Sequence, residues 1–229
     1  MNTLAYKNHH SLLVAVDCII FGFDGKDLKA LLVKRSLEPE MGKWSLMGGF
    51  VSRNESVEDA AVRVLDNLTG LTNIYMEQLH CFGNIDRDYA ARVISIAYFA
   101  LIKIDDYGEA LMKEHHAKWV ALNKIPPLVF DHKKMIQLSQ EYLQQKAINH
   151  PIGFELLPHK FTLQQLQALY EAVYVTTFDK RNFTKKILSL NLLQKLPEKE
   201  KSSSKKGAFL YTFNKEKYNQ LKKQGMRFL

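Results

Sequence analysis

The sequence predicts a mixed α/β (α+β) domain over residues 1–150, followed by a smaller basic domain over residues 151–229. Three observations predict this arrangement. Residues 1–150 hold 17 Lys and Arg against 18 Asp and Glu, a net charge of −1, whereas residues 151–229 hold 15 against 6, a net charge of +9. Proline cannot continue a helix, so Asn149-His150-Pro151 marks a break between the two parts. Finally, the first part mixes strand and helix patterns, whereas the second opens on two helices.

Composition places the chain among ordinary globular proteins, with 46% hydrophobic and 24% charged residues in 229. The longest apolar run, Leu12–Phe23, is shorter than the ~20 residues that span a bilayer and is interrupted by Asp17. Residues 1–7 are too short and too polar for a signal peptide. Cys18 and Cys81 lie singly in apolar segments, which favours reduced packing thiols. We therefore expect a cytoplasmic protein without a membrane partner.

The first domain opens with a predicted hairpin, because Leu12–Phe21 and Lys29–Val33 are apolar and the turn dipeptide Asp24-Gly25 separates them. Ser56 begins a capping-box-like helix start, apolar residues follow at helical spacing, and Gly70 ends the pattern. Further elements are expected to be strands at Val93–Ile104 and Lys118–Leu122 and a helix over Lys133–Lys146 that Asp131 caps.

The basic domain has the element order of a winged helix-turn-helix. Thr162 caps a predicted helix that runs to Val173, and a second helix begins near Asp179. Strands are expected at Leu192–Leu196 and Ala208–Phe213, joined by a charged loop over Pro197–Gly207. In this fold the second helix enters the major groove of DNA.

Two residues of the second helix are the best candidates for reading bases, because Arg pairs bidentately with guanine and Asn with adenine. They are Arg181 and Asn182. The candidates for phosphate contact are Lys180, Thr184, Lys185 and Lys186 on the helix and Lys199, Lys201, Ser202, Ser203, Ser204, Lys205 and Lys206 on the wing. The apolar residues Phe183, Ile187, Leu188 and Leu190 are expected to face the core. For the wing lysines, a solvated charged face is the alternative.

A motif in the first domain resembles the Nudix box. Gly49, Glu55, Arg63 and Gly70 stand at the spacing of that box, and Trp44-Ser-Leu-Met-Gly-Gly-Phe50 resembles the segment that leads into it. The family's catalytic glutamates fall at positions 64, 67 and 68, where one helix face could hold Mg²⁺ against a diphosphate. Here these positions are Val64, Asn67 and Leu68. We therefore expect no metal site and no cofactor, and diphosphate hydrolysis that is lost or very weak.

A degenerate Nudix-like domain followed by a winged helix resembles the NrtR family of Nudix-related transcriptional regulators. The resemblance implies a homodimeric repressor or activator that binds an inverted-repeat operator and responds to a small molecule. For the founding group that molecule is ADP-ribose or a relative, whereas a Bacteroidetes-type branch that controls pentose use responds to a sugar such as L-arabinose.

The segment Arg87-Asp-Tyr-Ala90-Ala91 departs from the Arg-Asp-Pro-Arg-Gly of ADP-ribose-binding members. Because Ala90 replaces a phosphate-binding cation, the segment favours a smaller, uncharged ligand. The candidate ligand-binding residues are Arg35, Lys43, Trp44, Phe50, Asp86 and Arg87. The alternative is that Trp44 belongs to the core and the charged residues to the surface.

Other readings compete with a ligand-responsive DNA-binding regulator. An active Nudix hydrolase of ADP-ribose or sugar nucleotides would still have Glu55 and Arg63 to bind its substrate. A non-catalytic module that binds an acidic protein is a third hypothesis. The pairs His9-His10 and His115-His116 have no third ligand at zinc spacing and are expected to be exposed turn residues.

Overall fold

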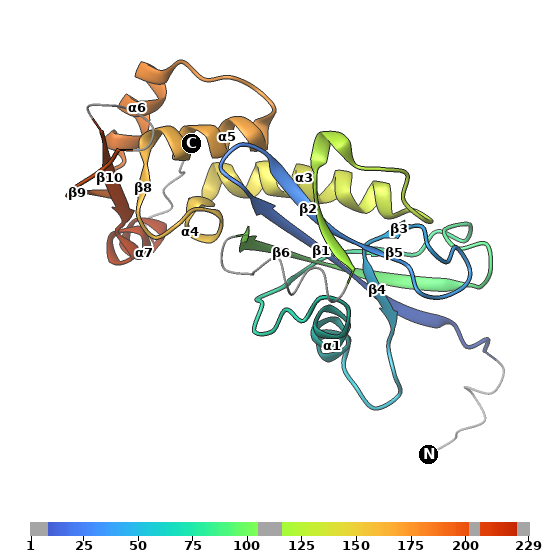
Figure 1. The fold of residues 1–229 in the computed structure, drawn as a ribbon. Helices are drawn as coiled ribbons and strands as arrows, with labels where there is room; N and C mark the ends of the chain where they lie inside the picture. The colour runs from blue at the N-terminus through green and yellow to red at the C-terminus, as the bar shows by residue number, and fades with distance from the viewer. Residues whose placement is uncertain (1–8, 105–115, 202–206, 224–229) are drawn as a thin grey trace.

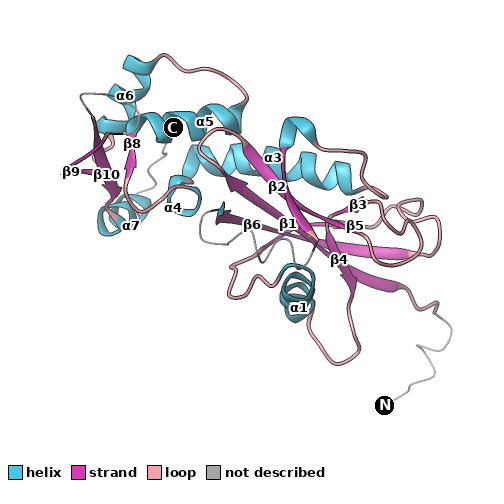
Figure 2. Ribbon diagram, viewed as in Figure 1, coloured by secondary structure: helices cyan, strands magenta, loops and turns pink. Residues whose placement is uncertain are grey.

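The structure, a computed structural model, describes residues 9–104, 116–201 and 207–223. The predicted order of a mixed α/β domain followed by a winged helix is confirmed (Figure 1, Figure 2). The elements of the first part are β1 (Leu13–Phe23), β2 (Leu28–Lys34), β3 (Trp44–Ser45), β4 (Met47–Phe50), α1 (Val57–Thr69), β5 (Glu77–Phe82), β6 (Val93–Lys103), β7 (Ala117–Ala121), the 3-10 helix η3 (Leu122–Lys124) and α3 (His132–Asn149). Those of the second part are α4 (Gly153–Leu156), β8 (Phe161–Thr162), α5 (Leu163–Tyr174), α6 (Lys180–Ser189), β9 (Leu193–Glu200), β10 (Ala208–Phe213) and α7 (Lys215–Lys223).

The first part is a mixed sheet with a helix on each face (Figure 1). The strand order is β3-β2-β1-β6-β5, with β4 also pairing with β1 and β7 with β2. Strands β1 and β6 run parallel over their whole length. Successive side chains of a strand point to opposite faces, so Cys18 and Ile20 join the core under α1, whereas Ile19 and Phe21 join the core under α3.

Helix α1 begins and ends as its sequence predicts. The Ser56 hydroxyl accepts a hydrogen bond from the Asp59 amide at 3.0 Å, and the Asp59 carboxylate accepts from the Ser56 amide, which completes a capping box. Gly70 adopts a left-handed conformation with φ 69° at the end of the helix. These local signals fix the helix against the sheet.

The second part is a winged helix whose two helices also carry side-chain caps. Thr162 caps α5 with a capping box, and the Asp179 carboxylate accepts a hydrogen bond from the Asn182 amide at 2.8 Å at the start of α6. Phe183 and Ile187 are buried as predicted. The prediction for Leu188 is wrong, because this side chain is 39% exposed.

The predicted wing loop is too long at its first end, since β9 continues to Glu200. Pro197 breaks the expected strand pattern because it cannot donate to a ladder. Strand β9 lies at the edge of the sheet, and its register with β10 shifts between Phe209 and Tyr211, so the ladder skips Pro197 in an irregularity. The remaining loop residues, Ser202, Ser203, Ser204, Lys205 and Lys206, lie outside the described residues.

One hydrophobic core continues from the sheet into the winged helix. It includes Phe21 of β1 and Leu143 of α3 together with Leu166 of α5. Gln144 Nε2 of α3 donates to the Val173 carbonyl at 3.0 Å, and the Tyr174 hydroxyl donates to the Gln144 carbonyl at 2.8 Å. Helix α3 is therefore attached directly to the first helix of the helix-turn-helix.

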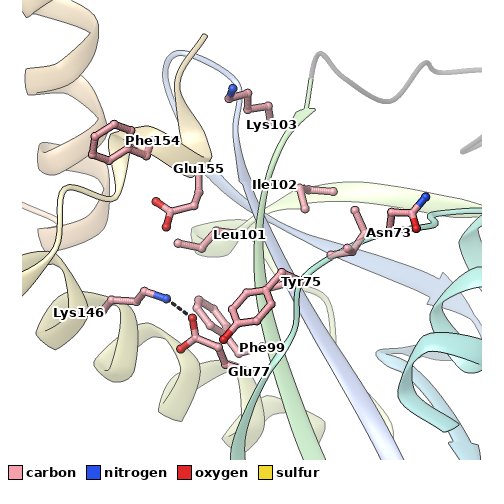
Figure 3. Close-up of a pocket in the computed structure, with 12 residues that line it drawn as sticks. Asn73, Tyr75, Glu77, Phe99, Leu101, Ile102, Lys103, Lys146, Phe154 and Glu155 are labelled. Carbon is pink, nitrogen blue, oxygen red and sulfur yellow. Dashed lines mark hydrogen bonds and ion pairs between the residues drawn. The ribbon is translucent and has the colours of Figure 1, made fainter. Parts of the chain in front are cut away.

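A cavity of about 310 Å³ lies at the same junction, between β6, the segment before β5 and α4 (Figure 3). On its wall, Lys146 of α3 donates to the Glu77 carboxylate, which also accepts a hydrogen bond from the Tyr142 hydroxyl at 2.5 Å. Phe154 and Glu155 of α4 form the side contributed by the winged helix. These polar contacts join β5 to α3 beside the shared core.

The two cysteines differ in their surroundings. Cys18 is buried and its thiol donates to the Ala61 carbonyl at 3.5 Å, as expected for a packing thiol. The same expectation is wrong for Cys81, which is exposed because β5 is an edge strand. His9, His10 and His116 are exposed as predicted, and His115 lies outside the described residues. None of the described helices combines the length and apolar character needed to cross a bilayer.

Candidate functional site

Helix α1 presents an apolar surface where the Nudix box would place carboxylates. Val64 is buried beneath β4, Leu68 is half-buried against the same core, and Asn67 is exposed. Gly49 of β4 allows this close packing, because a Cβ at Gly49 would lie 2.6 Å from Val64 Cγ2. Across the described ranges, no three His, Cys, Asp or Glu side chains come together so that they could hold a metal ion.

The two charged residues that remain of the box form an ion pair. Arg63 donates from Nε and Nη2 to the two Glu55 carboxylate oxygens at 2.8 and 2.6 Å, and Nη2 also donates to the Phe50 carbonyl at 2.9 Å. The Arg63 guanidinium and the Ser52 amide lower the pKa of Glu55 to about 2. This pair therefore fixes the segment between β4 and α1.

A cavity of about 820 Å³ lies near the predicted ligand residues, between β5, the following loop and the start of α3. Asp86 and Arg87 line it, together with residues that the sequence analysis did not select. These are His80, Cys81, Phe82, Gly83, Asn84, Tyr89, Phe130, Asp131, Lys133, Lys134 and Gln137. The structure thus brings two of the six predicted ligand residues to one cavity.

The other four predicted ligand residues do not line this cavity. The Arg35 guanidinium lies 5.2 Å from the ring centre of Phe130, and Lys43 pairs with Glu40, which accepts a hydrogen bond from Tyr89. Arg35 therefore contacts a residue that lines the cavity, whereas Lys43 is connected to the lining residue Tyr89 only through Glu40.

The two aromatic residues predicted to bind the ligand, Trp44 and Phe50, do not line the cavity. Trp44 is half-buried and packs against the core, as its alternative interpretation states, with the Lys34 ammonium 4.3 Å from its ring centre. Phe50 is 53% exposed at the end of β4.

A buried polar cluster adjoins the cavity and contributes Arg87 and Asp131 to its wall. Arg87 donates from Nε and Nη2 to the Asp131 carboxylate at 3.1 and 2.8 Å, and its Nη2 lies 3.5 Å from Asp17 Oδ2. Asp17 also accepts a hydrogen bond from the Ser95 hydroxyl at 2.5 Å. Arg87 is therefore a buried, paired cation.

His132 belongs to the same cluster and is held in its neutral form. The Leu46 amide donates to His132 Nδ1 at 3.1 Å, so this nitrogen carries no proton, and His132 Nε2 lies 3.4 Å from Asp17 Oδ1. Burial lowers the pKa of His132 below its ordinary value, although the Asp17 charge opposes this effect. The only sequence signal for this cluster was an Asp inside an apolar run and the Asp131-His132 pair ahead of a helix.

Asp131 does not cap α3 as the sequence predicts. It occupies the N-cap position, but its side chain makes no capping hydrogen bond and its backbone, at φ −99° and ψ 15°, is not extended. The carboxylate turns to Arg87 instead, because a buried guanidinium needs a counter-charge more than the helix start needs a cap.

The predicted DNA-reading helix exposes its polar side chains. In α6, Lys180, Arg181, Asn182, Lys185 and Lys186 are exposed and Thr184 is half-buried. The buried side of the helix packs through Phe183, which stacks on Phe178 at 5.8 Å and lies 6.0 Å from Tyr170 between ring centres. One face of α6 thus collects basic and amide groups while the other anchors it to α5.

The described part of the wing carries further cations. Lys201 is exposed at the end of β9. Lys195 and Lys199 place their ammonium groups 3.5 and 4.5 Å from the ring centre of Phe209.

Comparison with known proteins identifies both parts. The NUDIX domain family matches residues 11–139, and the NrtR DNA-binding winged helix domain matches residues 153–213. An ADPR responsive transcriptional repressor, NtrR, from Acinetobacter baylyi is 31% identical over 217 residues, which cover 93% of this chain and 86% of that protein. The chain belongs to the NrtR family.

The chain is also similar to a further NrtR protein and to an enzyme. The crystal structure of Shewanella oneidensis NrtR complexed with a 27mer DNA has a TM-score of 0.78 and 30% identity, covering 94% of this chain and 97% of that one. The ADP-ribose pyrophosphatase of Methanocaldococcus jannaschii is 39% identical over 144 residues, which cover 62% of this chain and 79% of that protein.

Proposed function

We propose that the chain is a DNA-binding transcriptional repressor whose Nudix domain binds ADP-ribose or a related nucleotide without hydrolysing it. The observation that carries this proposal is the apolar replacement at Val64 and Leu68 in a domain that shares its core with a basic winged helix. Without carboxylates at positions 64, 67 and 68, helix α1 lacks the groups with which a Nudix hydrolase would hold Mg²⁺ at a diphosphate. Binding without turnover suits a sensor.

The cavity beside Arg87 supports a nucleotide-sized ligand more than a pentose. Its volume of about 820 Å³ is at the upper end of the ~300 to 1,000 Å³ typical of ligand sites. Phe130 and Tyr89 provide aromatic surfaces in the cavity. Lys133 and Lys134 provide positive charges there, whereas Ala90 stands where ADP-ribose-binding members carry a cation. The names of the Acinetobacter and Methanocaldococcus relatives both refer to ADP-ribose, so the pentose hypothesis becomes the weaker alternative.

The DNA-binding half of the proposal places the exposed face of α6 in the major groove and the wing on the phosphates. We place the domain boundary near residue 150, where α3 ends at Asn149. A homodimer would present two such helices to an inverted repeat with half-sites about 10 bp apart, or a multiple of this spacing.

Selection of bound duplexes from a random DNA pool at about 150 mM salt tests the DNA-binding half, because non-specific attraction is weak at that salt concentration. We expect an enriched inverted repeat. The affinity of that duplex is then measured with ADP-ribose and with L-arabinose, and Lys118→Ala, an exposed charge change on β7, is the control. An unenriched pool would contradict the proposal, and an effect of L-arabinose alone would restore the pentose hypothesis.

An active ADP-ribose hydrolase is the second candidate, favoured by the 39% identity to the Methanocaldococcus pyrophosphatase and by the intact Glu55–Arg63 pair. Its test is AMP release from ADP-ribose with Mg²⁺ or Mn²⁺. Turnover that is lost on chelation and on Glu55→Gln substitution would support the hydrolase. Binding of ADP-ribose without turnover would support the sensor.

A further inference from the structure

The turn that precedes α3 joins the ligand cavity to the helix that contacts the DNA-binding domain. Phe130 and Asp131 line the cavity, and α3 begins at the next residue. Gln144 lies thirteen residues after Asp131, about 20 Å further along at 1.5 Å per helical residue, and makes hydrogen bonds with Val173 and Tyr174 of α5. Figure 1 shows α3 lying along the sheet and reaching α5.

This turn is held in an unfavourable conformation. Phe130 has a positive φ of 49°, which side chains other than those of Gly, Asn and Asp seldom adopt. Asp131 occupies an N-cap position without capping, whereas Ser56, Thr162 and Asp179 are extended and cap their helices. Strained backbone at a cavity wall is where a second conformation is to be expected.

The Arg87–Asp131 pair directs the Asp131 carboxylate to Arg87 instead of to the start of α3, and both residues line the cavity. Arg87 has two carboxylate neighbours, but Asp17 is also held by the Ser95 hydroxyl and by His132. Asp131 has no other side-chain partner among the interactions of the described residues. An anion that binds the Arg87 guanidinium would therefore displace Asp131 and leave Asp17 in place.

We propose that Asp131 is the positioning residue that couples the cavity to the winged helix. When an anionic group of the ligand binds the Arg87 guanidinium, the Asp131 carboxylate is released from Arg87 and turns to cap α3. The ligand class is a phosphate or diphosphate ester, which rests on the proposed function. Capping requires the Phe130–Asp131 turn to become extended, which changes the start of α3 and is transmitted along the helix to α5. The states without and with ligand thus differ in the partner of the Asp131 carboxylate. The ligand therefore binds one state better than the other, as a ligand-driven shift in their populations requires.

Two substitutions separate the roles of Asp131. Asn caps helices as well as Asp but forms no ion pair with Arg87, so Asp131→Asn should adopt the liganded state without ligand. Asp131→Ala can neither pair nor cap. Its DNA affinity should be nearly independent of ADP-ribose, in contrast with the roughly 5- to 150-fold coupling typical of allosteric proteins. Asp66→Ala, the same truncation at an exposed acidic residue of α1, is the control and should keep the coupling of the unmodified chain.

The experiment uses the full chain and measures the affinity for its selected duplex with and without saturating ADP-ribose, and ADP-ribose binding by calorimetry. A second readout is hydrogen exchange of the first turn of α3 with millimolar inorganic diphosphate, which does not depend on DNA or on ADP-ribose. Diphosphate should slow this exchange in the unmodified chain and leave it unchanged in Asp131→Ala.

The outcomes distinguish the two proposals. Unmodified coupling in Asp131→Ala, or exchange that diphosphate does not slow in the unmodified chain, would overturn the role of Asp131. If ADP-ribose does not bind and diphosphate still slows exchange in an Asp131-dependent way, the coupling role stands and the proposed effector is wrong.

Discussion

A methyl group of Val64 occupies the space beside Gly49 so closely that a Cβ on the glycine would lie 2.6 Å from it. This contact seals α1 against β4 at the point where a Nudix hydrolase carries its first catalytic glutamate. The degenerate box is thus a packed surface, and its replacement residues have a structural role.

Val64→Glu should therefore destabilise the chain. The site is 3% exposed and lies in an apolar core, so burial of a carboxylate there should lower the free energy of unfolding by more than about 2 kcal/mol. Urea unfolding measures this change. Asn67→Glu, on the exposed side of α1, is the matched control and should change stability by less than about 0.5 kcal/mol.

Glutamates at positions 64, 67 and 68 together should create an affinity for Mn²⁺ that the unmodified chain lacks, because the three lie on one helix face. Calorimetry with Mn²⁺ measures it. A triple variant that folds and binds no Mn²⁺ would show that the packing of α1 against β4 leaves no space for the ion.

Arg181→Ala should relax the preference for the selected duplex at one base position and cost about 1 to 3 kcal/mol of binding free energy. The exposed position of Arg181 near the start of α6 suits a base contact. Competition binding against single-base variants of the duplex measures the change. An equal loss on every sequence would reassign Arg181 to phosphate contact.

Lys201→Ala should weaken binding to all duplexes alike and reduce the slope of log affinity against log salt by about one unit. Lys201 is exposed where β9 ends, as a phosphate contact requires. Titrations at several salt concentrations measure the slope. A changed base preference would contradict this assignment.

Val175→Gly should raise the free energy of unfolding by about 0.5 to 1 kcal/mol, because a β-branched residue is strained in the left-handed conformation and glycine is not. Val175 has φ 51° at the end of α5 and is 78% exposed, so its side chain contributes little packing. Val62→Gly, at an exposed position inside α1, should lower stability by about 0.3 to 0.5 kcal/mol. If the two substitutions changed the free energy of unfolding in the same direction in urea, backbone strain at Val175 would be excluded.

Glu55→Gln should flatten the acid dependence of stability. The Glu55 pKa is lowered from 4.5 to about 2 by Arg63, so the pair stabilises the fold above about pH 4.5 and this stabilisation is lost as the pH falls towards 2. The difference in unfolding free energy between the two proteins should therefore be largest near neutrality, shrink as the pH falls from about 4.5 towards 2, and vanish only below about pH 2. A difference that persists well below pH 2 would indicate loss of an uncharged contact.

Local signals were enough to predict most of the fold. The Asp24-Gly25 turn, the Ser56 and Thr162 capping boxes and Gly70 each act within a few residues, and the elements that they bound were predicted correctly. Short strands such as β3 and β8 were missed because two residues carry no periodicity, and they exist only through pairing with distant strands. Helix α7 was not predicted because its few apolar residues leave a weak pattern.

The candidate ligand site was less predictable, because its members come from separate segments. Arg87 and Asp131 are 44 residues apart and form an ion pair at the cavity wall. No local sequence pattern predicts such a pair. Asp131 directly precedes a helix, so its local sequence predicts only that it caps this helix. The buried guanidinium that competes for this carboxylate is visible only in three dimensions.

The parallel pairing of β1 with β6 also has a consequence during synthesis on the ribosome. Each residue of β1 meets a partner 80 positions later, from Leu13 with Val93 to Phe23 with Lys103. At roughly 5 to 20 residues per second, about 4 to 16 s pass between the synthesis of a β1 residue and that of its partner in β6. In that interval one edge of β1 is open to other chains, so overproduction should be most prone to aggregation when translation is slowed between the two strands.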